Sequence, residues 1–207
     1  TYKLRLLPSG IVRKHKISVI GNGVVIDPWA LIEEMDEIKS KGVTVDVNNL
    51  IISEAATLIL PFHRELDEIR EDLAGISKIG TTRRGIGPAY EDKVGRRSIR
   101  VMDLASEENL DKRLDNALIH HNAIRKGLGK DNFEKESLKK ELLKIAPKLL
   151  KFSQPVWKKI GEFKKEQLKN DLLNIAPQIL KFSQPVWKKI DEFKSQNKKI
   201  LFEGAQG

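Results

Sequence analysis

The first hundred residues alternate between short apolar runs and longer amphipathic stretches. The apolar runs have strand character and end at turn signals such as Pro8-Ser9-Gly10 and Gly21-Asn22-Gly23. The predicted strands or extended segments are Tyr2–Leu7, Ile17–Ile20, Val24–Ile26, Val43–Val47 and Leu50–Ile52. Because they alternate with helical patterns, they predict an α/β protein with a mixed or parallel sheet rather than a helical bundle.

A helix is predicted to begin at the Asp27-Pro28 pair and to end near Gly42. An aspartate accepts hydrogen bonds from the first free backbone N–H groups of a helix, and proline suits the first helical turn. The apolar face of this helix follows helical spacing and comprises Ala30, Leu31, Met35 and Ile38.

The second half of the chain, from about Glu107 to Gln196, has helical spacing almost throughout. One amphipathic stripe steps by three and four residues and comprises Leu138, Leu142, Ile145, Leu149 and Phe152. Pro147 lies within this stripe and predicts a kink or a break. Lys198–Glu203 then returns to a strand pattern before the final Gly204–Gly207 segment.

An internal repeat lies within the helical half. The segment Lys151–Ile160 recurs unchanged as Lys181–Ile190, an offset of 30 residues. Two copies are too few for a solenoid, so we interpret the repeat as a tandem duplication of one helix-turn-helix unit. It predicts an extra helical pair at the edge of the domain, with Trp157 and Trp187 as equivalent anchors. We therefore expect an α/β region over 1–105, a helical region with the repeat over 106–197, and a returning strand and loop over 198–207.

Composition is that of a soluble globular protein. No run approaches the roughly 20 apolar residues of a membrane helix, and the 207-residue chain has no cysteine, which excludes disulfides and thiolate sites. We expect a cytoplasmic protein with no membrane partner.

The net charge is +9 and is concentrated in lysines of the helical half. These lysines alternate with acidic residues, which is typical of a solvated helix face. An alternative is a basic helical module that binds nucleic acid or a protein partner through Lys158, Lys159, Lys188 and Lys189. Its aromatic residues are too widely spaced for base stacking, so nucleic acid is not the expected partner.

The segment Ile79–Val101 carries the strongest chemical pattern. It combines hydroxyl residues, glycines that allow close backbone approach, and arginines whose guanidinium groups match phosphate oxygens. Local chemistry alone allows a phosphate-binding surface or an ordinary glycine-rich loop with solvated arginines.

The histidines are weaker candidates. His63 follows an apolar run and is interpreted as a packed residue at a helix start rather than a catalytic base. His120 and His121 are adjacent, so on a helix their side chains diverge by about 100°. No metal-ligand spacing is present, and no protein-built metal site is expected.

The run from Gly80 to Arg97 resembles the signature segment of adenylosuccinate synthetases, close to GTT-x-RGIGPAYEDK-x-x-RR. Leu6–Ile11, Val19–Val25 and Phe202–Gly207 resemble three further blocks of the family in the same order. The chain departs from the pattern at Arg83, where many members carry Gly or Lys. The resemblance implies the α/β core of a P-loop-like, GTP-dependent ligase with a helix-rich second half.

The resemblance also implies roles for three residues. Thr82 contacts the IMP phosphate, and Arg96 reaches IMP in the neighbouring subunit of a homodimer. Gln206, in the final IMP-contact loop, hydrogen-bonds the base near its reacting oxygen. A threonine hydroxyl, an arginine and a glutamine amide suit these contacts chemically.

The family ligates IMP and L-aspartate with GTP and Mg²⁺ to form adenylosuccinate, in AMP biosynthesis. Its glycine-rich phosphate loop supplies the catalytic aspartate, and the chain contains no GxxxxGK[ST] pattern. We therefore expect no catalytic residue and no metal ligand within these residues, and no synthetase activity from this chain alone.

Overall fold

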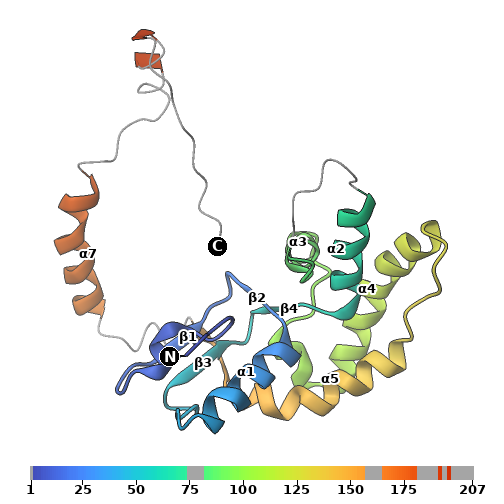
Figure 1. Cartoon of the computed structure of the whole chain (residues 1–207), viewed down its shortest axis with the longest axis horizontal. Coiled ribbons are helices and arrows are strands. Elements are labelled where there is room, and N and C mark those ends of the chain that lie inside the picture. The colour runs from blue at the N-terminus through green and yellow to red at the C-terminus, as the bar shows by residue number, and fades with distance from the viewer. Residues whose placement is uncertain (1, 74–81, 157–164, 181–190, 193–194, 197–207) are drawn as a thin grey trace. The chain divides into compact units, whose positions relative to one another are not determined.

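The chain forms a small parallel sheet accompanied by helices in a computed structural model (Figure 1), which describes residues 2–73, 82–156, 165–180, 191–192 and 195–196. Three strands pair in the order β1-β3-β5: β1 (Ser18–Ile20), β3 (Leu50–Ser53) and β5 (Ser153–Gln154). A second, two-stranded sheet pairs β2 (Val25–Ile26) with β4 (Thr57–Leu58). All these pairings are parallel, which confirms the predicted α/β class.

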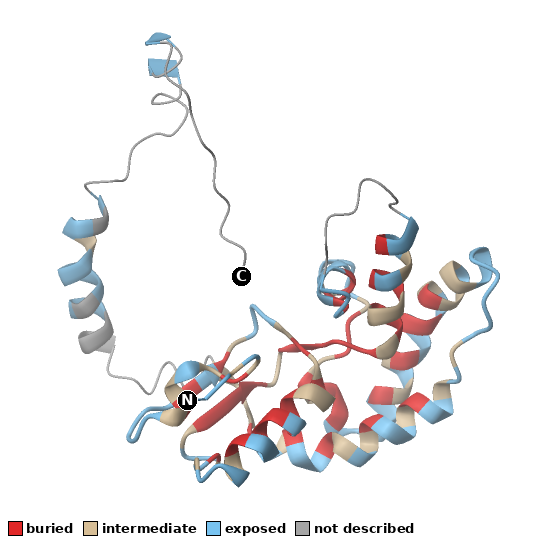
Figure 2. Ribbon diagram, viewed as in Figure 1, coloured by how far each residue is buried: buried red, intermediate tan, exposed pale blue. Residues whose placement is uncertain are grey.

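The central strand β3 carries the core. All four of its residues are buried, as is typical of a strand covered on both faces. Ser18 lies opposite Leu50 on one side, and Ile52 lies opposite Ser153 on the other. Figure 2 shows the buried positions concentrated on the strands and on the inner faces of the neighbouring helices.

Helix α1 (Pro28–Ser40) begins and ends close to the predicted positions. The Asp27 side chain accepts a hydrogen bond from the backbone N–H of Ala30 at 3.1 Å, and Pro28 occupies the first turn. Leu31, Met35 and Ile38 are buried on one face, so the predicted apolar stripe is confirmed.

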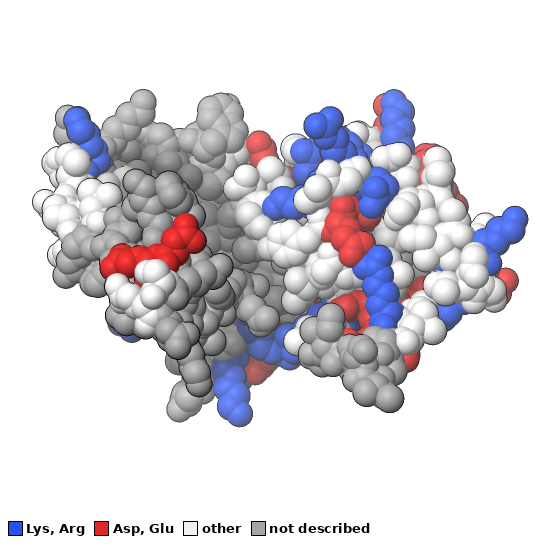
Figure 3. All heavy atoms as spheres, turned by 90° about the horizontal axis from the view of Figure 1, so that it is seen from above, with Lys and Arg blue, Asp and Glu red and all other residues white. Residues whose placement is uncertain are grey.

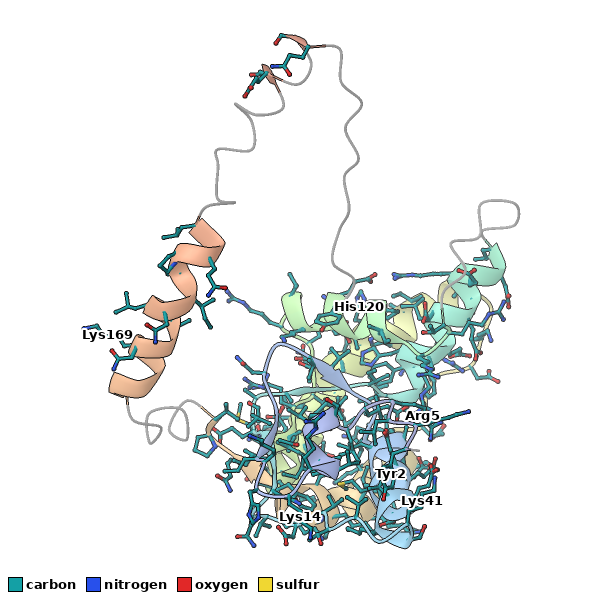
Figure 4. The ribbon with its side chains drawn as sticks, turned by 60° about the vertical axis from the view of Figure 1, so that its left-hand side comes forward. Tyr2, Arg5, Lys14, Lys41, His120 and Lys169 are labelled. Carbon is teal, nitrogen blue, oxygen red and sulfur yellow. The ribbon has the colours of Figure 1, made fainter. Side chains whose placement is uncertain are left out.

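The predicted strand Tyr2–Leu7 is wrong. The backbone N–H groups of Arg5 and Leu6 donate to the Glu34 carboxylate of α1, at 2.6 and 2.8 Å, instead of joining a ladder. Glu34 is 1% exposed, so these two contacts satisfy a buried charge. Figure 4 labels Arg5, which contacts α1, and the chain then enters a short 3₁₀ helix, η1 (Ser9–Val12).

The segment Val43–Val47, predicted as extended, also forms no strand. Asp46 and Asn49 fold it into a turn: the Asp46 carboxylate accepts from Asn48 N–H, and the Asn49 side-chain oxygen accepts from Asp46 N–H. Asp and Asn favour such turns because their short side chains bond to nearby backbone groups.

Five further helical segments lie between β4 and β5 in the described residues. They are α2 (Pro61–Leu73), α3 (Ile86–Val94), the 3₁₀ helix η3 (Val101–Ala105), α4 (Glu107–Gly127) and α5 (Lys135–Leu150). The helix-rich second half is therefore confirmed. Among the described residues, no helix has the length and apolar character of a membrane-spanning segment.

Helix α5 continues through Pro147 to Leu150, so the predicted break does not occur there. Its stripe buries Leu138, Leu142 and Leu149 against the core. Directly after it, Ser153 and Gln154 join the sheet as β5, a strand within the region predicted to be helical.

Residues 1–159 and residues 160–207 form two separate units. The second unit contains α7 (Lys165–Leu180), which lies directly before the second copy of the repeat in the sequence; that copy, Lys181–Ile190, lies outside the described residues. Trp157, Trp187 and the predicted strand near Ile200 lie outside the described residues.

Replacing Glu34 by glutamine tests its bond to the N-terminal segment. Glutamine keeps the shape but turns an N–H group toward a backbone donor, so we expect the free energy of unfolding to fall by about 1–3 kcal/mol in urea denaturation. The control is Glu33→Gln at the neighbouring exposed position, which should change stability by less than about 0.5 kcal/mol. Equal losses in both variants would contradict this role of Glu34.

Candidate functional site

The predicted phosphate-binding segment folds as α3 with a loop at each end. Gly85 precedes the helix with φ 76°, a conformation that L side chains rarely adopt. A Cβ at this position would lie 2.7 Å from the backbone nitrogen of Arg64, and the Gly85 N–H donates to Asp67 Oδ2 at 2.9 Å. Glycine is therefore required where α3 meets the start of α2. Gly80 and Thr81 lie outside the described residues.

The loop before α3 carries Thr82, Arg83 and Arg84, all exposed. Arg83 has φ 52° and forms an ion pair with Asp72. Arg83 and Arg84 line a cavity of about 520 Å³, whose other charged residues are Arg5, Asp27, Glu33, Arg64 and Glu68. The cavity is therefore mixed in charge, and the lining does not include Thr82.

The loop after α3 carries Arg96, which is exposed and has φ 59°. Arg96 lines a second cavity, of about 360 Å³, together with Asn22, Ala55, Thr57, Lys93, Ser98, Arg100 and Arg113. Every charged residue of this lining is a cation. The Oγ1 atom of Thr57 is buried and has no hydrogen-bond partner. A concave site whose charged residues are all cations suits an anion.

The carboxylate of Asp103 balances part of that positive charge. Arg100 Nε and Arg113 Nε lie 3.6 and 3.5 Å from the carboxylate of Asp103, which is 1% exposed. Lys93 donates to the carbonyl oxygen of Asn22. Among the described residues, Arg96 makes no ion pair, so its guanidinium remains available to a ligand.

Asp92 holds the loop that carries Arg96. Its Oδ1 lies 3.0 Å from both Nε and Nη2 of Arg97. Its backbone carbonyl accepts from the N–H groups of Arg97 and Ser98, at 2.9 and 3.2 Å. Three of these contacts fix Arg97, next to Arg96, on both its backbone and its side chain, and the fourth fixes the backbone of Ser98.

The other oxygen of Asp92 joins two histidines from two further helices. Oδ2 lies 3.0 Å from His63 Nε2 of α2 and 2.7 Å from His121 Nε2 of α4, and all three residues are at most 3% exposed. His63 Nδ1 accepts from the backbone N–H of Leu60 at 2.9 Å, so its proton lies on Nε2. Phe62 stacks on His121 at 4.1 Å between ring centroids. His63 is thus a packed residue at a helix start, as predicted.

Burial and hydrogen bonding set the charges of this cluster. Burial lowers the pKa of His63 and outweighs the opposing effect of Asp92, so the ring is neutral. Burial opposes ionisation of Asp92, but hydrogen bonds from His121 and His63 outweigh it and lower the pKa of the carboxyl. The folded cluster is an ionised carboxylate between imidazole N–H donors.

The same three residues are the one group in the described part of the chain with metal-ligand potential, with ligand atoms within 4.8 Å of one another. A metal on His63 Nε2 would require a proton on Nδ1, facing the N–H donor of Leu60. The arrangement therefore fits a hydrogen-bonded cluster better than a metal centre. Mg²⁺ fits it least, since that ion prefers oxygen ligands in octahedral geometry.

The three residues implied to contact substrate are not brought together. Thr82 precedes α3 and Arg96 follows it, and the nine residues of α3 span about 13 Å. The cavities at the two ends share no residue. Gln206 lies outside the described residues.

Sequence reasoning did not identify the Asp92 cluster, because its members come from three helices. One signal was present: His121 continues the buried spacing of Leu114 and Leu118 on α4. A histidine on an apolar stripe needs a buried polar partner, and Asp92 is that partner.

The described charges on the face that Figure 3 draws are of both signs. Figure 3 shows Lys and Arg beside Asp and Glu over the described parts of the visible face. Lys135 and Lys139 of α5 are paired with acidic residues of α4, including Asp111. Lys158, Lys159, Lys188 and Lys189 lie outside the described residues. The observed charges therefore favour no nucleic-acid interface.

The neutral state of His63 predicts a pH dependence. Because its pKa is lower in the folded than in the unfolded chain, where it is about 6.5, the unfolded state binds more protons as the pH falls. Above pH ~6.5 both states hold His63 neutral and it costs no stability. Below that pH the free energy of unfolding falls progressively. Urea unfolding at pH 7, 6 and 5 should show decreasing stability, with a smaller decrease in His63→Asn. Equal slopes would contradict this assignment.

Asp92→Asn should remove the charge that holds the cluster. Asparagine keeps one acceptor oxygen but turns an N–H group toward donors, and a hydrogen bond to a charged group is worth about 1.5–3 kcal/mol, so we expect a loss of that order in the free energy of unfolding. Glu91→Gln is the control at the adjacent residue. Glu91 is exposed and paired with Arg70, and loss of such a pair costs at most about 1 kcal/mol. Comparable losses would show that Asp92 is not the structural centre.

Comparisons with known proteins agree with this arrangement. The family model of adenylosuccinate synthetase matches residues 1–169. The fold is similar to that of a fully ligated adenylosuccinate synthetase from Plasmodium falciparum, with a TM-score of 0.63 and 30% sequence identity. The alignment covers 82% of this chain and 38% of that one, so the chain corresponds to well under half of that enzyme. The family match spans α3, both cavities and the Asp92 cluster, and the chain belongs to the adenylosuccinate synthetase family.

Proposed function

We propose that this chain supplies part of the IMP site of an enzyme that ligates IMP and L-aspartate to adenylosuccinate, with GTP as the energy source, in AMP biosynthesis. Family membership supports the reaction. The single observation that carries the assignment to these residues is the cationic cavity around Arg96. A nucleoside monophosphate presents a phosphate dianion, the ligand chemistry that this cavity suits.

Thr82 is proposed to contact the IMP phosphate. It is exposed in the loop before α3, next to Arg83 and Arg84. A threonine offers a hydroxyl and a backbone N–H, both of which donate to phosphate oxygens. The required glycine at position 85 fixes the end of this loop against α2, which limits the entropy lost when the phosphate binds.

Arg96 is proposed to contact IMP held by a second copy of the chain. Arg96 lies at the opposite end of α3 from Thr82, in a separate cavity. This separation supports a role for Arg96 on a different IMP molecule from the one that Thr82 of the same chain binds. Asp92 and Arg97 hold the loop in place, so Arg96 extends from a fixed backbone with a left-handed conformation. A homodimer with two-fold symmetry places each Arg96 at the partner's site.

The proposed enzyme involves one further residue of this chain, Gln206. Its further ligands are GTP, L-aspartate and Mg²⁺. Gln206 is proposed to hydrogen-bond the base of IMP. The residues that the structure describes do not form an oxygen-rich site for Mg²⁺, so no step through the metal is assigned to them.

A subunit-mixing experiment tests the shared site. Thr82→Val removes a hydroxyl at nearly constant volume, and Arg96→Asn removes the guanidinium with a residue that tolerates positive φ. Loss of a charge-assisted hydrogen bond should weaken IMP binding about tenfold or more in either variant alone. After the two variants are mixed and re-associated, random pairing should restore about a quarter of the wild-type sites, because heterodimers have one intact site.

Equilibrium dialysis with labelled IMP provides the measurement, and analytical ultracentrifugation confirms the dimer. The control is Arg13→Asn, which alters an exposed arginine outside both cavities and should leave binding unchanged. A mixture that binds no more IMP than the separate variants would contradict the shared site. Wild-type chain without IMP binding would contradict the proposed function itself.

A further inference from the structure

Helix α3 ends in a backbone motif that gives Arg96 an unusual conformation. The N–H of Arg97 donates to the carbonyl oxygen of Asp92 at 2.9 Å. The N–H of Arg96 donates to the carbonyl oxygen of Lys93 at 3.4 Å. These two bonds form a Schellman motif, whose left-handed residue directly after the helix cap is usually glycine. Here the glycine is the cap residue itself, Gly95, and the positive φ of 59° falls on Arg96.

A left-handed backbone is unfavourable for arginine. The Cβ of an L side chain crowds the following carbonyl in this region, whereas glycine has no Cβ and adopts it freely. A residue keeps such a conformation when the surrounding contacts fix it, and these residues cluster at functional sites. Arg96 makes no ion pair of its own among the described residues, so contacts of neighbouring residues hold it.

Arg97 makes those contacts. Its Nε and Nη2 atoms both lie 3.0 Å from Asp92 Oδ1, which is a two-point bond from a guanidinium to a carboxylate oxygen. The guanidinium also lies over Gly95, since a Cβ at that position would be 2.7 Å from Arg97 Cζ. Arg97 therefore holds the chain on both sides of Arg96: its backbone N–H fixes the residue that follows, and its side chain covers the residue that precedes.

Asp92, the acceptor in these contacts, is itself held by two further helices. Its Oδ2 atom contacts His63 of α2 and His121 of α4, which leaves Oδ1 for Arg97. The side chain of Arg97 is 27% exposed and does not line the cavity that Arg96 lines. Two adjacent arginines thus differ in direction, because Arg97 binds a buried carboxylate and Arg96 faces a cationic cavity.

We propose that Arg97 is a positioning residue for IMP binding, which acts through Arg96 and does not contact the ligand itself. Its bond to Asp92 and its contact with Gly95 hold the left-handed backbone at Arg96. The guanidinium of Arg96 therefore extends from an ordered loop, and less entropy is lost when it binds the ligand. This inference rests on the proposed IMP contact of Arg96.

Alanine at position 95 tests this role without removing a charge. Gly95 has φ −72° and ψ 1°, which alanine adopts readily, but the added methyl group would displace the guanidinium of Arg97. We expect Gly95→Ala to weaken IMP binding about threefold or more in equilibrium dialysis. The matched control is Gly87→Ala, at an exposed position of α3 where a Cβ would have no atom within 4 Å, and IMP binding should not change.

A double-mutant cycle distinguishes positioning from direct contact. Arg97→Met keeps the apolar stem of the side chain and removes its bonds to Asp92, so it should weaken IMP binding about threefold or more. In a chain that already carries Arg96→Asn, the same change should have little further effect, because the residue that Arg97 positions is then absent. A direct contact of Arg97 with IMP would instead give losses that multiply in the double variant.

Two results would overturn this role of Arg97 and leave the proposed function intact. One is a Gly95→Ala chain that binds IMP as tightly as the wild type, and the other is losses that multiply in the cycle. If circular dichroism shows that Arg97→Met does not fold, the comparison of Gly95→Ala with Gly87→Ala decides. Wild-type binding by Arg96→Asn, or no IMP binding by the wild type, would contradict the proposed IMP contact itself.

Discussion

The buried carboxylate of Asp92 is the interaction on which the arrangement of this part of the molecule depends. It accepts from His63 of α2 and His121 of α4, and its other oxygen and its carbonyl hold Arg97. An ionised group in an apolar interior is stable only when its lone pairs are occupied. Three helices and the loop that carries Arg96 are therefore joined by one charge, and a change in any donor affects the others.

Local patterns predicted the elements whose stabilising contacts are also local. Helix α1 follows from the Asp27 cap and its apolar spacing, and β3 follows from its buried run. The N-terminal segment was mispredicted because its backbone donors bond to Glu34, 28 and 29 residues away. Strand β5 was missed because two residues after a helix carry no strand signal, and only pairing with β3 makes them a strand.

The candidate site shows the same division between local and tertiary information. Local chemistry left the Ile79–Val101 segment open to two interpretations, a phosphate-binding surface or an ordinary glycine-rich loop, and family resemblance selected Thr82 and Arg96. Neither could show that the two residues lie at opposite ends of α3, beside cavities of different charge. The imidazole partners of Asp92 were likewise hidden, since histidines 63 and 121 meet only after α2 and α4 pack. Sequence spacing identifies chemistry within an element, whereas a site assembled from several elements needs the fold.

Helix α4 contacts both α5 and the residues around the proposed IMP contact. Its acidic residues Glu107, Asp111 and Asp115 receive the lysines of α5. Arg113 lines the Arg96 cavity, and His121 reaches Asp92. Helix α4 therefore contributes to two sets of contacts: the ion pairs that attach α5, and the Asp92 cluster and Arg96 cavity that support the proposed IMP contact.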